Sequence, residues 1–147
     1  METGITPDFL SFYRETMQME AVDASQYSPL VLAYVGDAVY ELMVRVKAVN
    51  HGNLPMNKLH KHSSHLVCAE TQAKLIKALE GELTPEEHAV FKRGRNAKSM
   101  TSAKNASVID YRYATGFEAL VGWLFLSEQF ERLTLLIRQG SDLLGEE

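Results

Sequence analysis

The stretch between Ser28 and Asn50 constrains the fold most, because it combines a start signal, a long apolar period and a stop. Ser28 can cap a helix, Pro29 suits its first turn, and Gly52 follows its end. The pattern predicts one amphipathic helix from about Ser28 to Asn50. Its apolar stripe consists of Val31, Val35, Ala38, Leu42, Val46 and Val49.

The rest of the chain also favours helices. Thr84 and Glu87 form a capping-box pattern around Pro85, and Gly81 is a natural helix end. The segment from Gly94 to residue 108 lacks an apolar period and is expected to be a basic loop. No alternating strand pattern and no internal repeat is evident, so the sequence predicts an all-α fold. We expect further helices over Pro7–Met19, Met56–Lys61, Ser63–Leu79, Pro85–Arg93, Tyr111–Leu126 and Ser127–Leu144.

Size and cysteine content narrow the class of protein. The chain has 147 residues, of which 46% are hydrophobic, which suits a single domain over residues 1–147. The one cysteine, Cys68, lies in a helical pattern and is expected to be a small buried side chain. No apolar run approaches the roughly 18 residues of a membrane span, and no signal peptide is evident at the start. We therefore expect a cytoplasmic protein with no membrane partner.

Charge is unevenly distributed along the chain. The net charge of −4 argues weakly against a nucleic-acid partner, yet residues 88–109 contain five cations and no acid. A second basic stretch, residues 45–77, contains one acid, Glu70, among its lysines and arginines. Two interpretations stay open, namely solvated helix faces or a positive surface that binds phosphates.

Asp37 lies in the middle of the predicted long helix, among hydrophobic residues. Residues three or four apart share a helix face, so Asp37 lies on one side together with Tyr34, Glu41 and Arg45. Spacing alone leaves three roles for this acid: an exposed helical residue, an ion-pair partner of Arg45 or of another cation, or a metal ligand on a rigid element.

Two short motifs resemble those of the ribonuclease III family. Leu32-Ala33-Tyr34-Val35-Gly36-Asp37-Ala38-Val39 is similar to the signature helix, and Phe117-Glu118-Ala119-Leu120-Val121-Gly122 is similar to the motif that completes the family's metal site. The motifs occur in the family's order, and the resemblance covers about Tyr27 to Gln129. It implies a ribonuclease III-like endonuclease domain in which Asp37 and Glu118 are catalytic and bind Mg²⁺, which Mn²⁺ can replace.

The match is closer to a short branch of that family, whose members lack the usual double-stranded-RNA-binding domain. Few residues follow Gly122, and the runs Arg93-Gly94-Arg95-Asn96-Ala97-Lys98-Ser99 and Tyr111-Arg112-Tyr113 also resemble that branch. Ala33 and Thr115 stand where the full family pattern has carboxylates. The number of metal ions therefore stays open. Glu41, one turn from Asp37, is a candidate for an outer-shell role, with a solvated side chain as the alternative.

The resemblance also implies how RNA is bound. Family members pair as homodimers so that two active sites face opposite strands of the duplex. The seam at Tyr34, Ala38 and Leu42 suits either that interface or an ordinary core. A-form RNA is read largely by shape across its wide minor groove. The candidate RNA-binding residues are Arg93, Arg95, Asn96, Lys98 and Lys104.

Three functions follow from these features. The first is a Mg²⁺-dependent endoribonuclease that cuts double-stranded regions of structured precursor RNA, leaving a 5′-phosphate and a 3′-hydroxyl. The branch implies large-subunit (23S) ribosomal RNA as the substrate, with a ribosomal protein as a candidate partner. The second is a non-catalytic RNA-binding or scaffold dimer, because two carboxylates are missing at Ala33 and Thr115. The third is a phosphohydrolase for small molecules, which usually needs a richer metal cluster.

Overall fold

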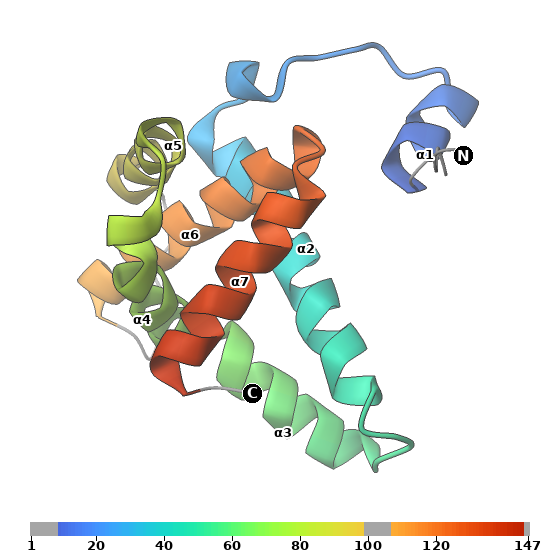
Figure 1. The fold of residues 1–147 in the computed structure, drawn as a ribbon, viewed down its shortest axis with the longest axis vertical. Helices are drawn as coiled ribbons and strands as arrows, with labels where there is room; N and C mark the ends of the chain where they lie inside the picture. Colours follow the sequence, from blue (N-terminus) through green and yellow to red (C-terminus); the bar gives the residue numbers. More distant parts are fainter. Residues whose placement is uncertain (1–8, 99–106, 146–147) are drawn as a thin grey trace.

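The computed structural model describes residues 9–98 and 107–145, and these residues contain helices and no strand. The all-α prediction is therefore confirmed (Figure 1). Short 3₁₀ turns occupy residues 24–26 and 80–82. The α-helices in chain order are α1 (Phe9–Thr16), α2 (Pro29–Val49), α3 (Met56–Val67), α4 (Ala69–Leu79), α5 (Pro85–Asn96), α6 (Val108–Leu126) and α7 (Phe130–Leu144).

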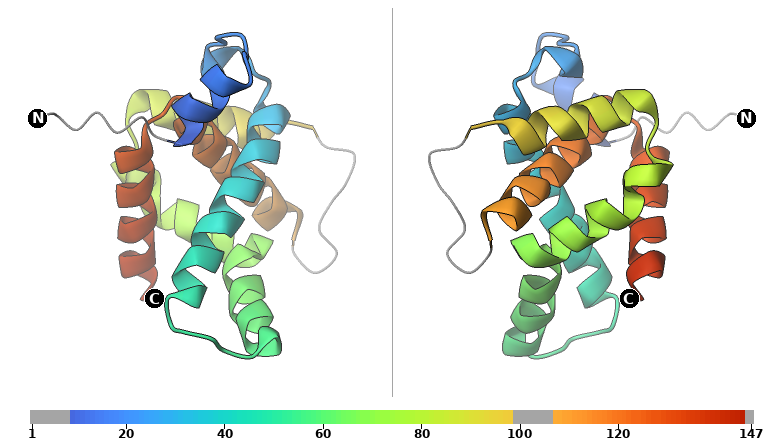
Figure 2. Two further views of the ribbon diagram at one scale, coloured as in Figure 1. Left: turned by 90° about the vertical axis from the view of Figure 1, so that its right-hand side faces the viewer. Right: turned by 90° about the vertical axis from the view of Figure 1, so that its left-hand side faces the viewer.

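Helix α6 is the centre of the structure. It contacts α2, α4, α5 and α7, and the ribbon passes between them (Figures 1 and 2). Phe117, Leu120 and Leu124 of α6 are fully buried, and the ring of Phe117 meets that of Tyr40 edge-on at 5.0 Å between centroids. Each such side chain stabilises the fold by about 1.5–3 kcal/mol through burial. Among the described residues, no helix is both long enough and apolar enough to cross a membrane.

The starts of α2 and α5 follow the predicted caps. The Ser28 hydroxyl accepts a hydrogen bond from the backbone N–H of Val31, and Thr84 and Glu87 form both bonds of the capping box. Helix α6 starts at Val108 rather than near residue 111, because the hydroxyl of Ser107 accepts from the backbone N–H of Asp110 at 3.0 Å.

The predicted boundary between the third and fourth helices was wrong. The chain breaks at Cys68, which has an extended backbone, and not near residue 62. Two side chains of α4 stabilise this break, since Thr71 donates to the carbonyl oxygen of His65 at 2.7 Å and Gln72 to that of Val67 at 2.9 Å. Cys68 itself is exposed rather than buried, because it stands at the break between the two helices, where its Sγ donates to the carbonyl oxygen of His65 at 3.3 Å.

The predicted end of α5 was also wrong, because Gly94 lies inside the helix. A Cβ at Gly94 would lie 2.7 Å from the Cβ of Ala119 and 2.9 Å from the Cα of Gly116. The glycine therefore allows α5 to approach α6 closely, and α5 continues to Asn96. The remaining part of the predicted loop falls largely on residues 99–106, outside the described residues.

Helix α2 buries a different face from the one predicted. Its buried residues are Leu32, Ala33, Gly36, Tyr40, Val44 and Ala48. The predicted stripe is mostly exposed, with Leu42 at 63% and Val46 at 60%. The seam at Tyr34, Ala38 and Leu42 therefore does not belong to the hydrophobic core of this chain. Periodicity could not separate the two faces, because both are apolar.

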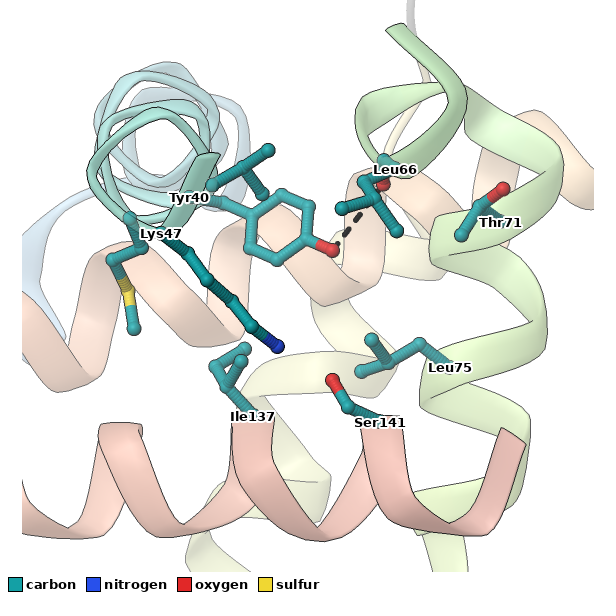
Figure 3. A pocket seen from close by; sticks show the side chains of 9 residues that line it. Tyr40, Lys47, Leu66, Thr71, Leu75, Ile137 and Ser141 are labelled. Carbon is teal, nitrogen blue, oxygen red and sulfur yellow. Dashed lines mark hydrogen bonds between the residues drawn. The ribbon is translucent and has the colours of Figure 1, made fainter. Parts of the chain in front are cut away.

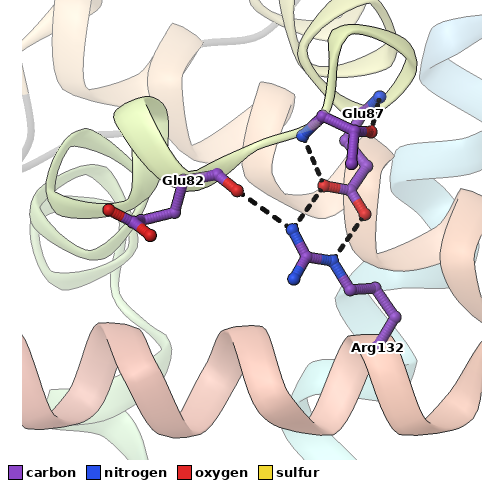
Figure 4. A network of polar contacts seen from close by, with 4 residues as sticks. Glu82, Glu87 and Arg132 are labelled. Carbon is purple, nitrogen blue, oxygen red and sulfur yellow. Dashed lines mark hydrogen bonds and ion pairs between the residues drawn. The ribbon is translucent and has the colours of Figure 1, made fainter.

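An ion pair joins α5 to α7. Arg132 donates to both carboxylate oxygens of Glu87, at 2.7 and 2.8 Å, and to the carbonyl oxygen of Glu82 at 3.0 Å (Figure 4). The Glu87 side chain is only 4% exposed. Its bond with Arg132 is the main cause that holds the pKa of Glu87 below its ordinary value. This pair fixes the helices that flank α6 on one side.

Candidate active site at a helix crossing

Helices α2 and α6 touch through their backbones at two glycines. A Cβ on Gly36 would lie 1.7 Å from the carbonyl oxygen of Glu118, and a Cβ on Gly122 would lie 2.0 Å from that of Leu32. These distances are far too short for any side chain. The two helices can therefore cross this closely only because both positions are glycine.

The crossing brings together two carboxylates that are far apart in the sequence. Asp37 directly follows Gly36, and Glu118 lies one helical turn before Gly122. Asp37 is exposed, whereas Glu118 is half-buried. The two side chains interact directly through a hydrogen bond. The two residues singled out from the sequence thus form one pair, with one member at the surface and the other beneath it.

Electrostatics at this pair are unusual. Burial first, and then the negative charge of Asp37 and the hydrogen bond with it, raise the pKa of Glu118 to about 8. A hydrogen bond from the side chain of Gln72 acts in the opposite direction. Burial and a neighbouring carboxylate both disfavour the charged form, so Glu118 holds its proton more tightly when no cation is bound.

The donor chemistry of the pair fits Mg²⁺. Carboxylate oxygens are its preferred protein ligands, and one or two of them commonly suffice when water and a substrate phosphate complete the shell. Ala33 and Thr115 are buried, and the Thr115 hydroxyl donates to the carbonyl oxygen of Tyr111 at 3.0 Å. Within residues 9–98 and 107–145, no group of three or more His, Cys, Asp or Glu side chains could hold a metal.

Glu41 is engaged elsewhere. Its carboxylate accepts two hydrogen bonds from the guanidinium of Arg45, one of them from Nε at 3.0 Å. Arg45 is thus the partner of Glu41 and not of Asp37. An outer-shell role for Glu41 stays a prediction.

The candidate RNA-binding residues are divided between two surfaces. Arg93 and Asn96 line a hollow together with Lys92, beside Pro29 at the start of α2. Arg95 does not line this hollow. Its guanidinium stacks on Phe91 and Tyr113, 5.5 and 5.7 Å from the ring centroids, and its Nε donates to Oδ1 of Asn96 at 3.3 Å. Lys98 is exposed just beyond the end of α5, and Lys104 falls outside the described residues. Lys92, which the sequence grouped only with the general charge, therefore joins Arg93 and Asn96.

Gln72 is the residue of this site that sequence reasoning missed. It lies on α4, is 1% exposed, and bonds the Glu118 carboxylate. A signal did exist, because Gln72 belongs to the buried side of α4 with Ala73, Leu75 and Ile76. A long polar side chain at such a position needs a partner in the core.

A separate cavity of about 140 Å³ lies where α2, α4 and α7 meet (Figure 3). Tyr40 spans it and donates to the carbonyl oxygen of Leu66 at 3.2 Å. Its other lining residues include Lys47, Leu75 and Ile137, and none of the residues lining it is a carboxylate. This cavity is therefore not an alternative metal site.

Comparisons with known proteins show the family of the chain. A family model described as the ribonuclease III domain matches residues 30–129. The chain is 52% identical to a protein named Mini-ribonuclease 3 from Enterococcus faecalis, over 84% of this chain and 96% of that one. It is 42% identical to a protein of the same name from Thermoanaerobacter, over 93% and 96% of the two chains. A crystal structure of protein FN1578 from Fusobacterium nucleatum superposes with a TM-score of 0.75 at 30% identity, covering 80% of this chain and 96% of that one.

The chain therefore belongs to the ribonuclease III family. Enzymes of this family are endoribonucleases that act on double-stranded RNA and generally depend on a divalent metal. Within the family, the chain belongs to the Mini-ribonuclease III branch, as its resemblance to the short members predicted.

Proposed function

We propose that this endoribonuclease uses Mg²⁺, held by Asp37 and Glu118, to cleave double-stranded regions of structured precursor RNA. The observation that carries the proposal is the carboxylate pair at the glycine crossing of α2 and α6. Both residues belong to the motifs that the family shares. The pair stands on two packed helices, which is the rigid support that a catalytic constellation needs.

The two carboxylates have different tasks in this proposal. Asp37 is exposed and faces the RNA phosphate, whereas the half-buried Glu118 anchors the site from below. When bound, Mg²⁺ supplies positive charge beside the scissile phosphate and lowers the pKa of a coordinated water. Glu118 gives up its proton on cation binding, so acid should weaken activity. Hydrolysis leaves a 5′-phosphate and a 3′-hydroxyl.

Cations beside the start of α2 suit the RNA backbone. Lys92, Arg93 and Asn96 surround one hollow, and α2 begins there at Pro29. Lysine and arginine bind phosphates irrespective of sequence, which fits recognition of A-form RNA by shape. Lys98 is exposed and directly follows Ala97, which also lines this hollow, so we expect it to extend this surface. We expect Lys104 to belong to it, and Arg95 to act through the aromatic rings beneath it.

A second copy of the chain completes the enzyme. The exposed face of α2 presents Tyr34 at 81% and Leu42 at 63% exposure. A groove lined by Ala38, Val39, Leu42, Met43, Phe125, Phe130, Leu133 and Thr134 continues this face. Contiguous exposed apolar surface of this kind is typical of a protein interface. A homodimer formed through α2 would place two carboxylate pairs on one RNA duplex.

The biological substrate follows from the branch. We assign precursors of large-subunit (23S) ribosomal RNA, in the cytoplasm, with a ribosomal protein that presents the cleavage site. Cleavage of such a precursor transcript with and without that ribosomal protein tests the assignment. If unrelated duplexes were cut equally well, the enzyme would have no preference for this precursor and the assignment would be wrong.

The decisive experiment compares wild type with Asp37→Asn. Purified proteins are incubated with end-labelled duplex or single-stranded RNA, in Mg²⁺ or EDTA, after circular dichroism has confirmed equal helicity. We expect Mg²⁺-dependent cutting of duplex alone, lost in Asp37→Asn. The absence of carboxylates at Ala33 and Thr115 supports one other candidate, a non-catalytic RNA-binding dimer. It requires salt-sensitive binding and no cleavage by the wild-type protein.

A further inference from the structure

Gln72 is a buried amide in the wall of the carboxylate site. It is 1% exposed, and it lies on the side of α4 that packs against α6. An amide transferred from water into a protein interior costs free energy unless its polar atoms find partners. Leucine or methionine would fill the same space at no such cost. The presence of glutamine therefore needs an explanation from its contacts.

Its hydrogen bonds are only partly satisfied. The amide nitrogen donates to the carbonyl oxygen of Val67 at 2.9 Å, and the side chain also bonds the Glu118 carboxylate. The amide oxygen, Oε1, is buried without a hydrogen-bond partner. An orphaned buried oxygen is rare in proteins and costs about 1–3 kcal/mol. The Gln72 amide is thus held in an orientation that leaves the oxygen unpaired, while the donor end contacts Val67 and Glu118.

We propose that Gln72 is a positioning residue, which holds the Glu118 carboxylate in the orientation that binds a divalent cation. The inference rests on the proposed function, since it takes Asp37 and Glu118 as the ligands. The negative charge of Asp37 disfavours a charged Glu118 carboxylate, and the hydrogen bond from Gln72 acts in the opposite direction. Mutating a residue that hydrogen-bonds a metal ligand commonly lowers the affinity for the metal by about 10–100-fold.

The chemistry of an amide suits this task. Arginine or lysine at position 72 would also donate to Glu118, but its positive charge would repel the cation. A neutral N–H group favours the carboxylate without competing for the site. The second bond, to the carbonyl oxygen of Val67, fixes the amide itself at the break between α3 and α4.

The test measures Mn²⁺ binding to RNA-free protein, by electron paramagnetic resonance at pH 7.5, for wild type and Gln72→Met. Thr71→Val is the matched control. Thr71 is the neighbouring residue, is 6% exposed, and also bonds a terminal carbonyl of α3. We expect Gln72→Met to weaken Mn²⁺ binding about 10-fold or more, and Thr71→Val to change it less than about twofold. Both variants should lose helix-junction stability to a similar degree.

Wild-type Mn²⁺ affinity in Gln72→Met would overturn the inference, as would an equal loss in both variants. Failure of the proposed function looks different, because Asp37→Asn and Glu118→Gln would then bind Mn²⁺ and cleave duplex like wild type. If Gln72→Met does not fold, the side-chain amide of Gln72 is followed by ¹⁵N NMR in the wild-type protein. A shift that saturates with Mg²⁺ supports the role, and an unmoved resonance contradicts it.

Discussion

At the scale of single residues, the site depends on the contrast between Asp37 and Glu118. One carboxylate is exposed and the other half-buried, so the same chemical group meets two different environments. Burial and the neighbouring charge raise the pKa of Glu118 to about 8. Strongly shifted pKa values are common at functional sites, because catalysis and ligand binding use charged groups that the folded protein does not stabilise without its ligand.

Glu118 should make the metal-free protein less stable as the pH rises. Its pKa is about 8 in the folded protein and 4.5 in the ordinary case, so the folded state holds this proton more tightly. Stability from this group is complete below pH 4.5 and is lost as the pH approaches 8. We expect urea unfolding in EDTA to show a decline for wild type between pH 5 and pH 8 that is smaller in Glu118→Gln. Parallel declines would contradict the assigned pKa.

At the scale of elements, the α2–α6 crossing depends on backbone contact. Gly36→Ala places a Cβ against the carbonyl oxygen of Glu118, and a backbone atom cannot move aside as a side chain can. We expect a loss of about 3 kcal/mol or more in the free energy of unfolding, measured by urea denaturation. Gly81→Ala is the control, because nothing lies within 4 Å of its Cβ. If Gly36→Ala left the free energy of unfolding nearly unchanged, the two helices could move apart without loss of stability, and the prediction would be wrong.

The Glu87–Arg132 pair, which joins α5 to α7, should contribute strongly to the stability of the fold. Glu87→Gln keeps the size of the side chain but leaves the Arg132 guanidinium without its charge partner. We expect a loss of about 3 kcal/mol at pH 7. Because the pKa of Glu87 is lowered, this stability exists above the ordinary value of 4.5 and is lost as the pH falls below it. Glu86→Gln, at an exposed position of the same helix, should change unfolding little.

Local signals predicted some element boundaries and not others. Ser28, Thr84 and Glu87 act on backbone groups within three residues, so the starts of α2 and α5 could be predicted. The break at Cys68 depends on side chains of the following helix, and Gly94 depends on contact with α6. Neither is visible in a local pattern. Motif order identified Asp37 and Glu118, whereas Gln72 needed the three-dimensional neighbourhood.

At the scale of the whole molecule, α2 serves two purposes with two apolar faces. One face packs on α6 through the buried residues around Gly36, and the other presents Tyr34 and Leu42 to the outside. A chain that folded only to bury its own core would not need the second face. The net charge of −4 likewise hides a local cationic hollow around Lys92 and Arg93. Both features become intelligible if two copies act on one RNA duplex.

Leu42→Glu tests this arrangement without disturbing the core. Leu42 is 63% exposed and lines the apolar groove, so a charge there should leave the helices intact and prevent a second copy from packing. Leu135→Glu is the matched control, since Leu135 is 61% exposed and is not among the residues lining that groove. By light scattering after size-exclusion chromatography, we expect a dimer for wild type and Leu135→Glu, and a monomer for Leu42→Glu. Because one domain alone contacts little of a duplex, the monomer should also lose most of its cleavage. A Leu42→Glu variant that stays dimeric would move the interface away from α2, and a monomeric wild type with full activity would remove the need for a second copy.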